Sequence, residues 1–228
     1  MEFARSVAAL ADLPLAAALL EYTNFYIRLG FGRDFSPEHP GWRGFVASVS
    51  DWAGPAAAAH RLYLAQPPGT GAPPIVATFG CFAYERRASG HIRLHFADAE
   101  RDGRSPLAPD RQGTRRAELA ALFAHVKATT PQAAGVIGAS WLYNLDAYRC
   151  LFPPLYLATA RAIPRAFQHM PLWGQFVNRR GEMRAEMAAE LRCRMARQSS
   201  LDSLDRCFPL PALRLEAPLR DFFEFYEV

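Results

Sequence analysis

Lysine is almost absent from this sequence: Lys127 is the only lysine among 26 lysine and arginine residues. Arginine therefore carries nearly all of the positive charge, a bias that a GC-rich genome produces and that also suits bidentate binding of anions. Cysteine is sparse as well, and the four cysteines lie far apart with no C-x-x-C pair. This spacing argues against a zinc ribbon and against a small disulfide scaffold.

Long apolar runs are also missing. No uninterrupted apolar segment reaches the roughly 18 residues that a helix needs to cross a bilayer. Arg5, Asp12 and Pro14 interrupt the apolar stretch near the N-terminus, where we recognise no cleavable signal. We therefore expect a cytoplasmic protein with no membrane partner. The basic residues are spread among 22 acidic ones rather than gathered into one motif, so we expect no nucleic acid partner.

The composition is that of a folded protein, because 50% of the residues are hydrophobic and 12% are aromatic. The pattern along the chain predicts one domain over 1–228 of α/β or α+β class, with a mixed, largely antiparallel central sheet covered by helices. The sheet is expected over about 60–142 and a helical extension over about 153–228. The predicted elements are a helix at 13–29, a strand at 61–65, apolar strand runs at 75–84 and 91–97, a helix at 111–128, a strand at 135–141, a helix at 180–198 and an aromatic tail at 213–228 that packs on the body.

Two histidines stand four residues apart, at His91 and His95. On a helix this spacing would place both imidazoles on one face, as in helical zinc sites. The segment 91–97 alternates apolar and polar residues, which is typical of a strand. In a strand the two residues would lie roughly 13 Å apart, too far to share one metal ion. We therefore expect no metal site.

The order of the elements over about residues 60–152 resembles the core of the GNAT-type N-acyltransferases. The shared features are a long antiparallel pair, a loop with glycine and arginines, a helix, a strand, and Asn144-x-x-Ala147 opening a short helix. In that family the loop before the central helix binds the pyrophosphate of an acyl-CoA through backbone N–H groups, which uses a helix N-terminus as an anion site. Residues 110–117 (DRQGTRRA) occupy that place without the family's Arg/Gln-x-x-Gly-x-Gly/Ala spacing. The family's tyrosine and Gly-Phe ending is replaced by residues 151–153 (LFP).

The resemblance implies an enzyme that moves an acyl group from a CoA-type thioester, its co-substrate, to a small-molecule amine. The donor's phosphates are then expected to bind at Arg111, Gly113, Thr114 and Arg115. The resemblance implies that His95 or Glu100 deprotonates the amine and that Tyr148 or Tyr143 protonates the leaving thiolate. We further expect Arg93, His95, Arg111 and Arg115 to converge at one end of the sheet around an anionic ligand.

Two other classes of function stay open. The chain could be a non-catalytic protein that binds a partner or forms a homo-oligomer through its aromatic and methionine-rich surfaces. It could also be a metal-dependent or phosphate-handling hydrolase that uses His91 and His95. The chain contains no Arg-His-Gly triplet of the histidine phosphatases, and no G-x-S-x-G elbow that would indicate a Ser/His hydrolase.

Overall fold

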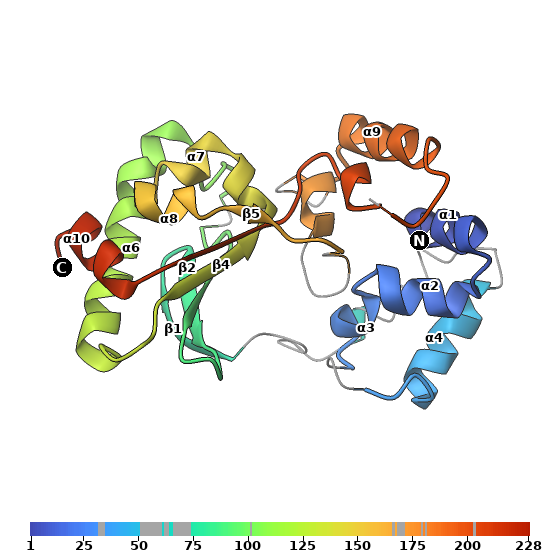
Figure 1. Cartoon of the computed structure of the whole chain (residues 1–228), viewed down its shortest axis with the longest axis horizontal. Coiled ribbons are helices and arrows are strands. Elements are labelled where there is room, and N and C mark those ends of the chain that lie inside the picture. Colours follow the sequence, from blue (N-terminus) through green and yellow to red (C-terminus); the bar gives the residue numbers. More distant parts are fainter. Residues whose placement is uncertain are drawn as a thin grey trace. The chain divides into compact units, whose positions relative to one another are not determined.

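The chain divides into two compact units in the computed structural model (Figure 1), and each unit has a hydrophobic core of its own. The first comprises residues 1–72, 164–171 and 189–209, and the second comprises residues 73–163, 172–188 and 210–228. The structure describes residues 1–31, 35–50, 61, 64–65, 74–100, 102–165, 167, 172–178, 180, 182–202 and 204–228.

The described part of the first unit is helical. Its core packs aromatic rings, among them Tyr26, Trp42 and Phe45, against small and aliphatic side chains. Its elements are α1 (Glu2–Ala11), α2 (Leu15–Tyr22), α3 (Phe25–Arg28), α4 (Pro40–Ser50) and the 3-10 turn η4 (Leu204–Cys207). The boundary between the two units falls within helix α9 (Ala185–Met195).

Two predictions from the sequence pattern are wrong in this unit. The single helix predicted at 13–29 is broken, because the extended backbone of Thr23 ends α2 and the Thr23 hydroxyl donates to the carbonyl of Leu19. The strand predicted at 61–65 is also wrong. Arg61 and Leu64 are helical, and the N–H of Ala65 donates to the carbonyl of Arg61 at 3.0 Å.

The second unit is built on a mixed sheet, which confirms the α+β class with a mostly antiparallel sheet and helices. In the described residues six strands lie in the order β1-β2-β3-β4-β6-β5, and only the β3–β4 pair is parallel. The strands are β1 (Ile75–Phe79), β2 (Phe82–Arg86), β3 (Ile92–Phe96), β4 (Val136–Ser140), β5 (Arg161–Ala162) and β6 (Leu213–Ala217). The last two strands come from the region predicted to be a helical extension, so that boundary of the sheet is corrected.

The apolar run predicted as one strand at 75–84 is a tight hairpin of β1 and β2. Gly80 has a φ of 56°, a left-handed conformation that favours glycine. A side chain at Gly80 would also overlap the carboxylate of Glu118. The N–H of Cys81 in the same turn donates to Glu118 Oε2 at 3.1 Å, so the turn is fastened to the neighbouring helix.

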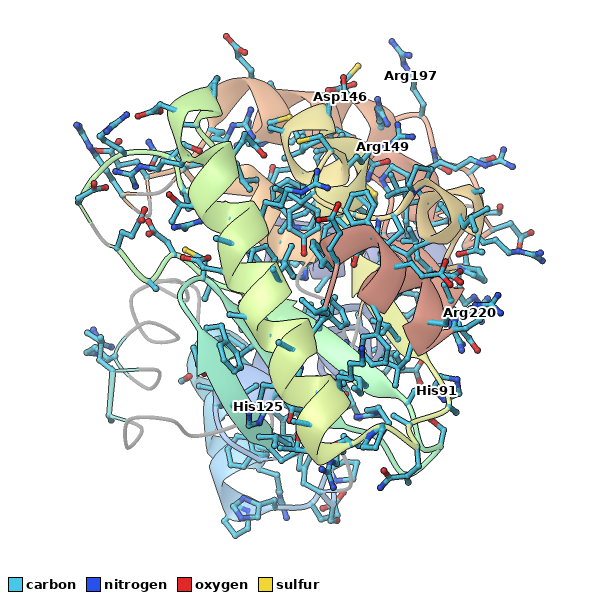
Figure 2. All side chains as sticks on the ribbon, turned by 90° about the vertical axis from the view of Figure 1, so that its left-hand side faces the viewer. His91, His125, Asp146, Arg149, Arg197 and Arg220 are labelled. Atoms are coloured by element: carbon cyan, nitrogen blue, oxygen red, sulfur yellow. The ribbon has the colours of Figure 1, made fainter. Side chains whose placement is uncertain are left out.

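Helix α6 (Gln112–Thr129) crosses one face of the sheet, as Figure 2 shows, and confirms the helix predicted at 111–128. Its stripe of Leu119, Leu122, Phe123 and Val126 belongs to one core cluster with the side chains of β2, β3, β4 and β6. The aromatic tail packs here as predicted, because α10 (Leu219–Tyr226) stacks on α6 with the rings of Phe123 and Phe222 4.6 Å apart.

Short elements complete the second unit. They are η1 (Pro109–Arg111), η2 (Trp141–Asn144), α7 (Asp146–Arg149), α8 (Pro154–Ala158) and η3 (Leu172–Phe176). The helix predicted at 180–198 is α9 and begins only at Ala185, because Val177 and Met183 form an antiparallel bridge just before it.

Candidate functional site

Strands β3 and β4 pair for only two residues before the pairing ends. Ile92 faces Val136 and Arg93 faces Ile137. On its other side, β3 stays paired with β2 as far as Phe96, and β4 stays paired with β6 as far as Ser140. The last three residues of each strand are therefore not paired with one another, and they lie at the carboxyl ends of two parallel strands. In open α/β sheets this is the edge where ligands bind.

Tyrosine hydroxyls lie directly over β4 where its pairing with β3 has ended. The hydroxyls of Tyr143 and Tyr156 are 2.8 Å apart, and a Cβ at Gly138 would overlap both of them. The ring of Tyr148 packs against that of Tyr143 and adds a third phenol to this group. Gly138 is therefore required by the close approach of the two phenols rather than by an unusual backbone angle.

Tyr148 projects from α7 into this aromatic cluster. Its ring centroid lies 5.3 Å from that of Phe96 at the end of β3 and 5.1 Å from that of Tyr143. Burial raises the pKa of Tyr148 well above its ordinary value, and Tyr143 adds to the shift. The phenol is therefore protonated at neutral pH and can donate a hydrogen bond or a proton. Figure 2 shows its neighbours in α7, Asp146 and Arg149, at the surface.

The opposite face of the sheet gathers basic side chains around one buried carboxylate. Glu85 in β2 is 2% exposed, and its Oε1 lies 3.1 Å from Arg87 Nη1 and 3.7 Å from Arg93 Nη1. His95 Nε2 lies 3.6 Å from Glu85 Oε2. Burial lowers the pKa of His95 despite the opposing effect of Glu85. A neutral imidazole at pH 7 is able to accept a proton.

The loop between β3 and α6 and the first turns of α6 hold a separate charge cluster. Arg115 is completely buried, and its Nη2 lies 2.8 Å from Oε1 of both Glu100 and Glu118. Its Nη1 donates to the thiol of Cys81. Arg111 donates to the second oxygen of Glu100. Both predicted phosphate-binding arginines therefore donate to carboxylates of this chain.

Arg111 also pairs with Asp102, with Nη1 lying 3.3 Å from Oδ1 and Nη2 bonded to the second oxygen. The hydrogen bond from Arg111 holds the pKa of Asp102 at about 2, and the N–H of Arg104 contributes. Glu100 accepts from two guanidinium groups, so both of its carboxylate oxygens are engaged in ion pairs.

The first turn of α6 is exposed at Gly113 and Thr114, and a side chain at Gly113 would meet nothing within 4 Å. The preceding loop uses several of its own donors. The N–H groups of Arg111 and Gln112 donate to the carbonyls of Ala108 and Pro109 through η1. These two N–H groups are therefore not free for a phosphate.

The four residues expected to converge on one anion do not meet at one point. Arg93 and His95 lie beside Glu85 on the sheet face opposite α6, whereas Arg111 and Arg115 lie at the α6 side with carboxylates of their own. The structure brings His95 together with Arg93, and Glu100 together with Arg111 and Arg115. Tyr148 joins neither charge cluster.

The sequence pattern did not identify the residues that organise these clusters. Glu85 and Glu118 hold the two basic groups, and Gly138 makes room for the phenols of Tyr143 and Tyr156. The glycine inside the strand predicted at 135–141 was an available signal for Gly138. Glu85 directly follows the predicted strand run 75–84, and its sequence position gave no sign that it would be buried.

His91 and His95 have different partners. His91 Nδ1 lies 3.0 Å from the hydroxyl of Ser89, and its Nε2 lies 3.1 Å from Glu216 Oε1. Figure 2 shows His91 at one end of the sheet. Within the described ranges, no group of three or more histidine, cysteine, aspartate or glutamate side chains is arranged to hold a metal ion.

No family model matches the chain, and no curated protein or solved structure matches it. In the described part of the chain no single helix is long and apolar enough to cross a membrane. The bent pair α1 and α2 passes that test jointly, by length and composition alone, with 118° between the two helices.

Proposed function

We propose that the protein transfers an acyl group from a CoA-type thioester to a small amine, and that the thioester binds where β3 and β4 separate. The observation that carries this proposal is the early end of the β3–β4 pairing. The ends of β3 and β4 are not paired with each other there, while β3 stays paired with β2 and β4 stays paired with β6. These strand ends lie next to the loop that leads into α6. The proposal also agrees with the GNAT-like order of the elements.

The proposal places one ligand between the ends of the two strands, where it would reach both faces of the sheet. His95 lies on the face with Glu85, whereas Tyr148 packs against Phe96 on the face that α6 covers. A thioester lying between the separated strands would have the imidazole on one side and the phenol on the other. The proposal therefore assigns them opposite tasks in proton transfer.

In the proposed reaction the amine nitrogen attacks the thioester carbonyl. A C–N bond forms, the C–S bond breaks, and the amine loses one proton while the departing thiolate gains one. His95, neutral at pH 7, accepts the proton from the nitrogen. Tyr148, whose phenol is protonated at pH 7, donates to the sulfur as the C–S bond breaks.

The donor's phosphates would first meet Gly113 and Thr114, which are exposed on α6. To bind a phosphate, Arg111 and Arg115 would each have to give up a carboxylate partner. The lost ion pair offsets part of the binding free energy gained from the phosphate. We therefore expect those two arginines to support the loop in the free protein and to contribute less to donor affinity than their charge alone predicts.

Isothermal titration with CoA and acetyl-CoA tests the binding step, and absence of heat at millimolar ligand would contradict the proposal. The chemical step is tested by following free thiol release with a panel of small amines. We expect His95→Gln and Tyr148→Phe to lower kcat about tenfold to a thousandfold while leaving donor affinity nearly unchanged.

His91→Gln is the matched control, because His91 lies four residues before His95 and next to the paired part of β3. We expect it to keep the wild-type rate. Equal loss of activity in the two histidine variants, together with stoichiometric metal by elemental analysis, would instead favour a metal-dependent hydrolase.

A further inference from the structure

A cavity of about 600 Å³ lies between the loop that follows β3 and a small hairpin before α9, within the second unit. Its volume is in the range of sites for small molecules. Ser105 and Pro106 line one side, and the hairpin lines the other with the residues Val177, Asn178, Arg180 and Arg184.

The hairpin is held in shape by hydrogen bonds. The N–H of Asn178 donates to the carbonyl of Glu182 at 2.8 Å, and the N–H of Arg184 donates to the carbonyl of Phe176 at 2.8 Å. The Asn178 side chain closes the turn, because its Oδ1 accepts from the N–H of Arg180 at 2.8 Å and from that of Glu182 at 3.1 Å. The backbone of Arg180 and that of Arg184 are thereby held at the tip and at the base of one hairpin.

The base of the hairpin is anchored in the unit by a buried side chain. Gln175 is completely buried, and its Nε2 donates to the carbonyls of Leu172 and Leu210 at 2.9 and 3.2 Å. Its Oε1 accepts from the N–H of Leu210 at 2.9 Å. Arg184 Nη1 donates to the carbonyl of Gln175 at 3.4 Å, which fixes one side of the guanidinium. Among the described residues its other donors have no bonded partner, so they can serve a ligand.

The charge of this cavity differs from that of the clusters around Glu85 and Glu100. Among the described residues, its lining includes two arginines and no carboxylate, and neither Arg180 nor Arg184 forms an ion pair there. The carboxylate of Glu182, which lies between the two arginines in the chain, accepts from Asn178 Nδ2 at 2.8 Å. By contrast, Arg111 and Arg115 each have a carboxylate partner. Two uncompensated guanidinium groups at one cavity repel each other, and a dianion between them removes that repulsion.

We infer that this cavity is a binding site for a ligand carrying phosphate groups, with Arg180 and Arg184 as its charged contacts. A guanidinium binds phosphate oxygens in pairs, and the Ser105 hydroxyl at the cavity offers a further polar contact, whereas the Asn178 amide is engaged within the hairpin. The volume accommodates a nucleotide. The phosphate can belong to a free nucleotide or to the nucleotide end of an acyl-CoA, and the inference stands without the proposed function because it rests on the cavity alone.

Calorimetric titration with pyrophosphate, ADP, adenosine 3′,5′-bisphosphate and CoA tests the inference, with succinate as a dicarboxylate of similar charge. We expect wild-type protein to bind the phosphate compounds and not succinate. Arg180→Gln and Arg184→Gln each remove one charged contact and are expected to weaken binding about tenfold to a hundredfold. Both side chains are exposed, so thermal unfolding of these variants should match that of the wild type.

Arg220→Gln is the control, because Arg220 lies in the same unit on α10, is 78% exposed, and is labelled at the surface in Figure 2. It should bind like the wild type. Wild-type protein that binds none of the phosphate compounds, variants that bind them unchanged, or tighter binding of succinate than of pyrophosphate would each overturn the inference.

The same titrations separate the inference from the proposed function. Binding of ADP and pyrophosphate that depends on both arginines, with CoA bound no more tightly than ADP, would support the cavity and count against the acyl donor. CoA binding that is unchanged in Arg180→Gln and Arg184→Gln would overturn the cavity as the phosphate site and leave the acyl-transfer proposal standing. CoA binding that exceeds ADP binding and falls in both variants would identify the donor's nucleotide as the ligand.

Discussion

Arg115 Nη2 and Glu100 Oε1 lie 2.8 Å apart, and the guanidinium is completely buried although the carboxylate belongs to the loop after β3. The same nitrogen contacts Glu118 one turn further along α6, and Glu118 in turn accepts from the N–H of Cys81 in the β1–β2 turn. One arginine therefore joins a loop, a helix and a hairpin turn. A charge in this position contributes mainly by satisfying carboxylates that would otherwise be poorly solvated.

Replacing Arg115 should destabilise the protein strongly. Arg115→Met keeps much of the apolar stem but leaves Glu100 and Glu118 without their buried partner. We expect the free energy of unfolding in urea to fall by about 3 kcal/mol, the lower end for a broken buried pair, because both carboxylates are partly exposed. Arg149→Met, at an exposed pair 3.9 Å from Asp146, should change it by less than about 0.5 kcal/mol. Equal stability of the two variants would show that the buried pairing is not needed.

A methyl group at Gly138 should destabilise the protein because two phenols occupy its space. Gly138→Ala is expected to cost about 1–3 kcal/mol in the free energy of unfolding, since the Cβ would overlap the hydroxyls of Tyr143 and Tyr156. Adding Tyr156→Phe should recover part of this cost, which a double-mutant cycle measures.

Gly113→Ala gives the matched control for that substitution. Gly113 is exposed in α6 with open space around it, so alanine should stabilise the helix by about 0.5–1 kcal/mol. A Gly138→Ala variant as stable as Gly113→Ala would contradict the close approach of the phenols.

Asp102 should titrate far below its usual range because of one neighbour. Its pKa in the folded protein is about 2, set first by the hydrogen bond from Arg111. Arg111→Gln should return this pKa toward about 3.9, and carbon NMR of the carboxyl group can follow the change. The depressed pKa means that the associated stability is present above about pH 3.9 and is lost as the pH falls through 2.

His95 should make the folded state sensitive to mild acid. Its pKa is lowered by burial, with Glu85 opposing the shift and with Arg93 and Arg87 adding to it. Since the folded state then binds this proton less readily than the unfolded state, stability should be complete above about pH 6.5 and decline as the pH falls below it. Urea unfolding between pH 5 and 8 should show a smaller decline in His95→Gln than in the wild type. Identical pH profiles would contradict the lowered pKa.

The sequence by itself determined those helices and strands that are set by the local spacing of apolar residues. The stripe of Leu119, Leu122, Phe123 and Val126 predicted α6, and the alternation over 91–97 predicted β3 and placed Arg93 and His95 on its polar face. The candidate residues His95 and Tyr148 were named from the resemblance, and their roles stay predictions. The alternation alone also indicated that His91 and His95 lie too far apart along a strand to share one metal ion.

Only the tertiary structure decided which distant residues meet. Strand β6 pairs with β4 across a long stretch of chain, since Val136 and its partner Ala217 are 81 positions apart, and the sequence of β6 does not indicate that partner. The carboxylates that engage Arg111 and Arg115, and the cavity that brings Arg180 and Arg184 opposite Ser105, likewise depend on long-range packing. The periodicity of a helix or strand reflects which of its residues are buried. Which charged residues pair with one another depends instead on how the helices and strands pack together.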